Sequence, residues 1–106
     1  MAKYLVVASY TADGIKGVIS KGGAARRDAV ARMVGDLGGK VESFHFGFGE
    51  GHAYVLIDLP DNVSAAALGL AVSASGMATT KTTVLLTPEE IDRAVKTQVT
   101  YSAPGS

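Results

Sequence analysis

The sequence contains no cysteine, and this absence excludes several kinds of chemistry. Without thiols the chain can form neither disulfides nor thiolate nucleophiles, and it cannot hold zinc or iron–sulfur clusters through sulfur ligands. Because cysteine-free chains suit compartments in which disulfides do not persist, we expect a cytoplasmic protein.

An excess of one charge sign and a long apolar run are also missing. Ten Lys and Arg residues balance ten Asp and Glu residues, so no net positive charge attracts the phosphates of nucleic acids. The longest apolar stretch, residues 65–72, is far shorter than the roughly 20 residues that cross a bilayer. The apolar segment at residues 4–8 is too short for the core of a signal peptide. We therefore expect a soluble, unexported protein that binds neither nucleic acid nor membranes.

The length of 106 residues is enough for one hydrophobic core and too short for two. The hydrophobic share of 47% and the charged share of 19% are those of an ordinary globular protein, which argues against disorder throughout. We predict a single domain at residues 1–96, followed by an extended or flexible tail at residues 97–106.

Hydrophobic patterning predicts strands at residues 3–10, 40–49, 53–59 and 77–86. The first and third strands contain unbroken apolar runs rather than alternation, which indicates that both of their faces are covered. The second strand alternates, which predicts one face with Glu42, Phe44, Phe46 and Phe48. The other face is expected to carry Val41, Ser43, His45 and Gly47. The turn residues Gly49-Glu50-Gly51 predict a hairpin between the second and third strands.

Helical spacing and capping residues predict four helices. The first is a short helix of a turn or two that ends at Gly22-Gly23, and the second lies between this pair and Gly38-Gly39. The third spans residues 61–75, and the face that we expect it to bury carries Val63, Ala66, Ala67, Leu70 and Ala74. The segment Thr87-Pro88-Glu89-Glu90 is a capping box that opens a short fourth helix.

The order strand, helix, hairpin, helix, strand predicts an α+β protein with the ferredoxin-like βαββαβ fold, here with an additional C-terminal helix. In this fold the first and third strands lie at the centre of a four-stranded antiparallel sheet, and the two helices cover one face only. The apolar residues on the other face predict a homodimer or a higher homo-oligomer that forms through the sheets. The alternative is that the C-terminal helix folds over the open face.

Short motifs follow one another in a specific order from residue 4 to about residue 96. They are Tyr4-Leu5-Val6, Ser9-Tyr10-Thr11, Gly14-Ile15-Lys16-Gly17, Gly22-Gly23, Ala25-Arg26-Arg27 with Val30, Leu37-Gly38-Gly39-Lys40-Val41-Glu42-Ser43, Phe48-Gly49-Glu50, Asp58-Leu59-Pro60-Asp61-Asn62, and Lys81-Thr82 to Glu90. Together they resemble the GYD-domain family, which implies a dimeric α/β-barrel type of assembly and no particular activity. Where that family has a Tyr-Asp pair after the Phe-Gly-Glu element, this chain has Gly51-His52, so a role of the pair does not carry over.

Five side chains are candidates for binding a small molecule in a pocket between the sheet and its partner: Tyr10, His45, Phe46, His52 and Lys81. Aromatic side chains with a few polar groups are typical of such pockets. Alternatively, Tyr10 packs with its hydroxyl group in water, and Lys81 protects an edge strand against aggregation.

The two histidines flank the hairpin turn, where Glu42 or Glu50 could complete a sparse metal site. Because the sequence has no H-x-x-x-H spacing and hairpin histidines are often only solvated, we predict no metal site. An anion could instead bind where Lys21-Gly22-Gly23 precedes a helix that carries Arg26 and Arg27. The alternative is that the glycines separate two helices and the arginines are solvated.

These features favour a small-molecule binding module, and they identify neither its ligand nor a cofactor. One alternative is a cofactor-independent enzyme of the dimeric α/β-barrel type, which rests on analogy of fold. The other is a structural subunit of an oligomer that binds no ligand. The sequence has no G-x-S-x-G element and no carboxylate pair whose spacing demands acid–base catalysis, so nothing in it predicts a catalytic residue.

Overall fold

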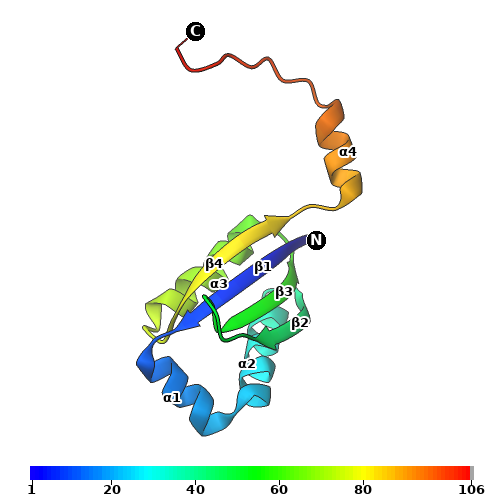
Figure 1. Cartoon of the computed structure of the whole chain (residues 1–106). Helices are drawn as coiled ribbons and strands as arrows, with labels where there is room; N and C mark the ends of the chain where they lie inside the picture. The colour runs from blue at the N-terminus through cyan, green and yellow to red at the C-terminus, as the bar shows by residue number, and fades with distance from the viewer. Residues whose placement is uncertain (106) are drawn as a thin grey trace.

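The computed structural model describes residues 1–105, so residue 106 of the predicted tail lies outside the described residues. The elements follow one another in the order β1 (Ala2–Tyr10), α1 (Ala12–Lys21), α2 (Gly23–Asp36), β2 (Lys40–Phe46), β3 (Ala53–Leu59), α3 (Asn62–Ala74), β4 (Ala78–Leu85) and α4 (Pro88–Lys96) (Figure 1). The predicted α+β class and the predicted order of elements are confirmed. Helix α1 has ten residues and is therefore longer than the turn or two that we expected.

The four strands form one antiparallel sheet in the order β2-β3-β1-β4. The two strands with unbroken apolar runs, β1 and β3, occupy its centre, as predicted. Leu5 of β1 lies between Leu56 of β3 and Thr83 of β4 in the register of the sheet. Helices α2 and α3 lie together behind the sheet as Figure 1 is drawn, so the sheet has one covered face and one open face.

The hydrophobic core lies between the covered face of the sheet and helices α2 and α3. Its most deeply buried large side chains are Tyr4, Val34, Ile57 and Leu59, each no more than 1% exposed. The hydroxyl group of Tyr4 donates a hydrogen bond to Oδ1 of Asn62 at 2.7 Å, which satisfies the one polar group of this buried ring.

Helix α3 buries a different face from the one that we predicted. Ala65 and Leu68 are buried against the sheet, whereas Val63 is 77% exposed and Leu70 is 71% exposed. The helix is apolar on almost every side, so its sequence does not single out one stripe, and packing against β4 determines its orientation. Gly69 takes part in this approach, because a Cβ atom there would lie 3.4 Å from Oγ1 of Thr80.

Strand β2 also differs from the predicted alternation. Its pairing with β3 shifts by one residue between Val41 and Ser43, which is the signature of a β-bulge. The bulge places Val41 on the side of Phe44, against the core, and turns Glu42 toward the open face, where it pairs with Lys3. The strand ends at Phe46, so Phe48 lies fully exposed in the turn.

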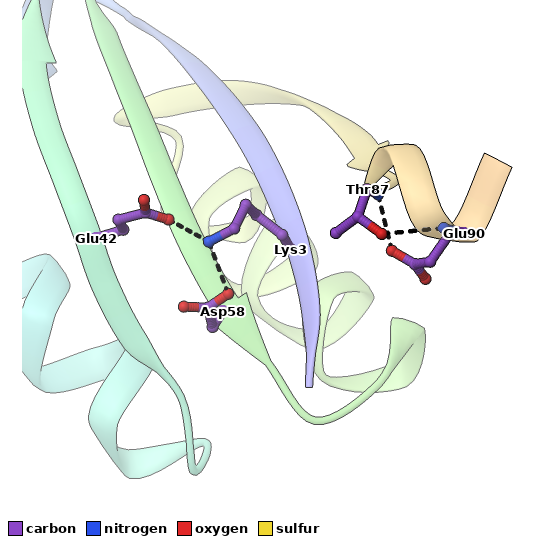
Figure 2. Close-up of polar contacts among 5 residues, drawn as sticks. All are labelled: Lys3, Glu42, Asp58, Thr87 and Glu90. Atoms are coloured by element: carbon purple, nitrogen blue, oxygen red, sulfur yellow. Dashed lines mark hydrogen bonds and ion pairs between the residues drawn. The ribbon is translucent and has the colours of Figure 1, made fainter. Parts of the chain in front are cut away.

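The open face of the sheet is apolar at its centre and charged at one end. Because side chains alternate along a strand, the neighbours of the buried core residues point to this face, and they include Leu5, Val7, Tyr54 and Leu56. At the charged end, Nζ of Lys3 contacts Glu42 and lies 3.0 Å from Oδ1 of Asp58 (Figure 2). The hydrogen bond to Glu42, and to a smaller extent the hydrogen bond to Asp58, raises the pKa of Lys3 above its ordinary value.

Helix α4 lies beyond the end of β4 and does not fold over the open face (Figure 1). The alternative in which the C-terminal helix covers this face is therefore not what the structure shows. The predicted capping box is present, because the Thr87 side chain accepts the Glu90 N–H and the Glu90 carboxylate accepts the Thr87 N–H (Figure 2). These bonds lower the pKa of Glu90. None of the helices described in residues 1–105 has the length and the apolar character that crossing a bilayer requires.

Candidate functional site

A cavity of about 480 Å³ lies between α1 and α2, beside the C-terminal part of α3 and the beginning of β4. Small residues form much of its wall, namely Gly14, Gly17, Gly22, Ala25, Ala29, Ala71, Ser75 and Ala78. Its larger apolar side chains are Val18, Met33, Val72 and Met77, and its polar ones are Tyr10, Asp13, Lys21 and Arg26. The volume falls within the range of roughly 300–1,000 Å³ that is typical of small-molecule sites.

Gly22 separates the two helices that enclose the cavity. It is both the C-cap of α1 and the N-cap of α2, and its φ of 90° lies in the region that favours glycine. Its N–H donates to the carbonyl oxygen of Val18 at 2.7 Å, which closes the last turn of α1. The chain then changes direction, and the two helices diverge from this point, as Figure 1 shows.

Helix α1 is fixed to the beginning of β4 at one point. The backbone N–H of Thr11 donates to the carbonyl oxygen of Met77 at 2.9 Å, and a Cβ atom on Gly14 would lie only 2.0 Å from that same oxygen. One turn further on, a Cβ atom on Gly17 would meet nothing within 4 Å, although Gly17 lines the cavity. Glycine at position 14 therefore permits close packing, and glycine at position 17 leaves the cavity open.

Arg26 brings a positive charge to this mainly apolar cavity. Its guanidinium carbon lies 5.8 Å from the ring centroid of Tyr10, within the range of a cation–π contact. Its Nε is buried and has no hydrogen-bond partner among residues 1–105. A buried donor without a partner costs about 1–3 kcal/mol, so an acceptor bound beside Arg26 would be stabilised. Arg27, by contrast, points its Nε at Oδ1 of Asp28 at 3.2 Å on the surface.

His52 contacts Tyr10, which lines the cavity. Its Nδ1 accepts the backbone N–H of Tyr10 at 2.8 Å, and the two rings stack with centroids 5.8 Å apart at 18°. Since Nδ1 accepts this bond, the proton of the neutral imidazole is on Nε2. His52 does not line the cavity itself, so it acts as a positioning residue for the end of β1.

The other sequence-predicted residues divide between the two faces of the sheet. Phe46 lies on the covered side, edge-on to Phe44 with centroids 5.2 Å apart and beneath Gly23 at the start of α2. His45 and Lys81 lie on the open side by strand alternation, and Lys81 belongs to the edge strand β4. Tyr10 and Phe46 therefore share no pocket with His45 and Lys81 within one chain.

The geometry does not bring the two histidines together as metal ligands. His45 lies on the open face of the sheet, and Nδ1 of His52 already accepts a hydrogen bond. The described residues contain no group of three or more His, Asp or Glu side chains that could hold a metal ion.

Sequence reasoning missed the cavity residues on α1 and α3. Gly17, Ala71 and Ser75 carry no chemistry that a motif search detects, because their contribution is a lack of side-chain volume. The detectable signal was a glycine at position 17 in the interior of a helix, which costs stability relative to alanine and suggests a packing or functional reason.

Comparison with known protein families identifies the family of this chain. A family model described as GYD domain matches residues 4–95, from β1 into α4, and so includes the sheet and all three helices that border the cavity. Comparisons with curated proteins and with solved structures gave no match. The chain belongs to the GYD domain family.

Proposed function

We propose that the chain is a small-molecule binding module, and that the cavity between α1 and α2 binds a compound with an apolar body and one acidic group. The observation that carries this proposal is Arg26, whose buried Nε lacks a partner among residues 1–105 at the edge of a cavity of about 480 Å³. The planar guanidinium group is suited to carboxylate and similar oxyanions, and its contact with Tyr10 holds it in place.

The remaining surroundings of the cavity favour the same class of ligand. Val18, Met33 and Val72 provide an apolar surface for the body of the molecule. Helix α2 begins at Gly22 without a side-chain cap and without an acidic residue in its first turn, so its positive end is available to an anion. Arg26, one of the two arginines of the anion site that the sequence suggested, lines this cavity, whereas Arg27 pairs with Asp28 on the surface, so the proposal assigns the anion to Arg26 alone.

Filling the cavity tests the proposal. Gly17→Phe places a ring in the open space, and Gly35→Phe is the matched control because a Cβ atom on Gly35 in α2 also meets nothing within 4 Å and Gly35 does not line the cavity. We expect the fluorescent dye anilinonaphthalene sulfonate to bind wild type and Gly35→Phe equally, and Gly17→Phe at least about tenfold more weakly. Equal binding by all three proteins would exclude the cavity as the site.

Neutralising the arginine tests the acidic group of the ligand. Arg26→Gln should weaken binding of the sulfonate dye by about tenfold or more, since a hydrogen bond to a charged group contributes about 1.5–3 kcal/mol. Arg27→Gln, the control, should bind like wild type. Uncharged phenylnaphthylamine should be insensitive to both substitutions, and an equal loss for both dyes in Arg26→Gln would indicate a packing role for Arg26 instead.

A second property, self-association through the open face of the sheet, is favoured by a different observation. Leu5, Val7, Tyr54 and Leu56 point to the open face of the two central strands, where the turn at Gly51 lies against Val7 and Tyr54 and no helix of residues 1–105 covers Leu5 and Leu56. An apolar area that is left uncovered in this way is typical of a protein interface, and a second copy is the simplest partner.

Sedimentation over a concentration series tests self-association. We expect wild type to be dimeric or larger at micromolar concentrations, and Leu56→Lys to be monomeric. Leu70→Lys introduces the same charge at an exposed site on α3 and should assemble like wild type. A wild-type protein that remains monomeric at micromolar concentrations would refute this second proposal and leave the ligand proposal untouched.

A further inference from the structure

A second, smaller cavity lies in the core of the domain. It measures about 40 Å³ and is bordered by the covered face of the sheet on one side and by α2 and α3 on the other. Protein interiors are close-packed and leave few voids larger than a water molecule, which needs about 10–15 Å³. This space, which we call the inner chamber, is therefore larger than an ordinary packing defect.

Short side chains on facing elements leave the inner chamber open. Ala8 of β1 pairs with Ala53 of β3 on the covered face of the sheet. Ala65 and Gly69 of α3 line the chamber from the opposite side. A Cβ atom on Gly69 would lie 3.4 Å from Oγ1 of Thr80, so there is room for one methyl group at this point. Neither layer fills the space between them, because its side chains there are too short.

The inner chamber suits a small apolar group. Apolar side chains form most of its wall, and its polar side chains are those of Tyr10, Arg26, Thr80 and Thr82. Mainly apolar cavities stay dry and accept apolar molecules, but one that binds benzene measures about 150 Å³. The 40 Å³ of the inner chamber is far less, and it is only slightly more than the roughly 30 Å³ that one molecule of liquid water occupies. The chamber therefore fits a slim group of one or two carbons and excludes an aromatic ring.

The inner chamber meets the cavity between α1 and α2. Four side chains line both spaces, namely Tyr10, Arg26, Met33 and Val72. Arg26 is the one charged residue among the four, and its buried Nε has no partner among residues 1–105. An acidic group bound to Arg26 would thus lie at the junction, with the large cavity on one side and the inner chamber on the other.

We infer that the inner chamber is a subsite for a small alkyl branch next to the acidic group of the ligand. The protein then prefers acids in which the carbon beside the carboxylate carries a methyl or an ethyl group. This inference rests on the proposed function and narrows its class of ligand. The acidic group binds Arg26, the bulky apolar part fills the cavity between α1 and α2, and the branch fills the inner chamber.

A series of naphthylacetic acids tests the preference directly. The acids carry hydrogen, methyl, ethyl or tert-butyl at the carbon beside the carboxylate, and each separated enantiomer competes with protein-bound anilinonaphthalene sulfonate. For the better enantiomer, affinity should rise about fourfold from hydrogen to methyl and about fourfold again to ethyl, as burial of one more carbon each time predicts. It should fall by about tenfold or more from ethyl to tert-butyl, which exceeds the chamber. Affinity that does not depend on the branch, or that keeps rising to tert-butyl, would overturn the inference.

Filling the inner chamber provides a second test. Gly69→Ala adds a methyl group inside it, and Gly35→Ala is the matched control because Gly35 is also helical and lines neither space. Alanine is favoured over glycine in helices, so neither variant should lose stability. We expect Gly69→Ala to bind the unbranched acid like wild type and the ethyl-branched acid no better, whereas Gly35→Ala should keep the full preference. A preference that survives in Gly69→Ala, or an equal loss for every acid in this variant, would overturn the inference.

The same measurements separate this inference from the proposed function. If the unbranched acid binds wild type and Gly17→Phe weakens it, while the branch has no effect, only the role of the inner chamber is overturned. If no acid of the series binds, and wild type and Gly17→Phe bind the dye equally, the proposed function is overturned as well.

Discussion

Two glycines three residues apart in α1 should respond to alanine in opposite ways. A Cβ atom on Gly14 would lie 2.0 Å from the carbonyl oxygen of Met77, which also accepts the N–H of Thr11 at 2.9 Å. A Cβ atom on Gly17 would meet nothing within 4 Å. The two substitutions are chemically identical and lie in the same helix, so their difference isolates the contact between α1 and the beginning of β4.

The magnitudes follow from the two environments. Alanine is favoured over glycine in a helix interior by about 0.5–1 kcal/mol, and Gly17→Ala should gain this amount in full. Gly14→Ala gains the same but loses about 1–3 kcal/mol through overpacking and about 0.5–1.5 kcal/mol if the Thr11 bond breaks. With the Thr11 bond broken, the net effect of Gly14→Ala is a loss of about 0.5–4 kcal/mol.

Urea unfolding measures the difference directly. With unchanged m-values, the midpoint for Gly17→Ala should rise above wild type and the midpoint for Gly14→Ala should fall below it. Stabilisation of both variants by similar amounts would refute the contact between Gly14 and Met77. It would also mean that α1 does not lie where it forms a wall of the cavity.

Other parts of the fold give three further predictions. Asp61 caps α3 by accepting the Ser64 N–H at 2.9 Å, which lowers the pKa of its carboxyl group. The resulting stabilisation is present above the ordinary pKa of aspartate and is lost as the pH falls through the lowered pKa of the folded state. Asp61→Asn should therefore be less stable than wild type at neutral pH, and urea titrations at acidic pH should show a smaller difference. A difference that does not change with pH would contradict this account. Tyr4→Phe removes the hydrogen bond to Asn62 and should lower the free energy of unfolding in urea by about 0.5–1.5 kcal/mol, whereas no loss would place the hydroxyl group in water. Thr87→Ala breaks the capping box and, at concentrations where the chain is monomeric, should reduce the helical circular dichroism signal without moving the urea midpoint; a lowered midpoint would mean that α4 packs on its own domain.

The order of the elements was predictable because several independent local signals agreed. Unbroken apolar runs marked β1 and β3 as central strands, and the sheet order confirms this. The capping box at Thr87 and Glu90 depends only on four neighbouring residues, so it formed as the sequence indicated. Local rules of this kind need no knowledge of distant packing.

Two packing details were not predictable for a common physical reason. Helix α3 is apolar on nearly all sides, so Val63 and Leu70 were as plausible for burial as Ala65 and Leu68, which the structure buries. In β2, a bulge beside Val41 reversed the alternation of the residues before it. Both outcomes depend on the neighbouring element, which a pattern within one segment does not contain.

The cavity was only partly visible in the sequence. Tyr10, Gly22 and Arg26 were recognised as candidates, and the structure brings all three to the same cavity. Their meeting depends on the angle between α1 and α2, which follows from the positive φ of Gly22 and from the close approach at Gly14. His45 and Lys81 were grouped with Tyr10 although strand alternation separates them, because the prediction relied on a second chain to complete one pocket.

The cavity and the open face lie on opposite sides of the sheet, so the proposed ligand binding and the proposed self-association should be independent of each other. Leu5 and Val7 point from β1 to the open face, while Tyr10 and the α2 residue Arg26 border the cavity on the covered side. Leu5, Val7, Tyr54 and Leu56 do not line the cavity, so a second copy packed against them would not touch the proposed ligand through these side chains. The monomeric variant Leu56→Lys should therefore bind anilinonaphthalene sulfonate with wild-type affinity in a fluorescence titration. A loss of affinity of several-fold in this variant, with its thermal unfolding unchanged, would show that the second copy contributes to the site and that the cavity described in one chain is incomplete.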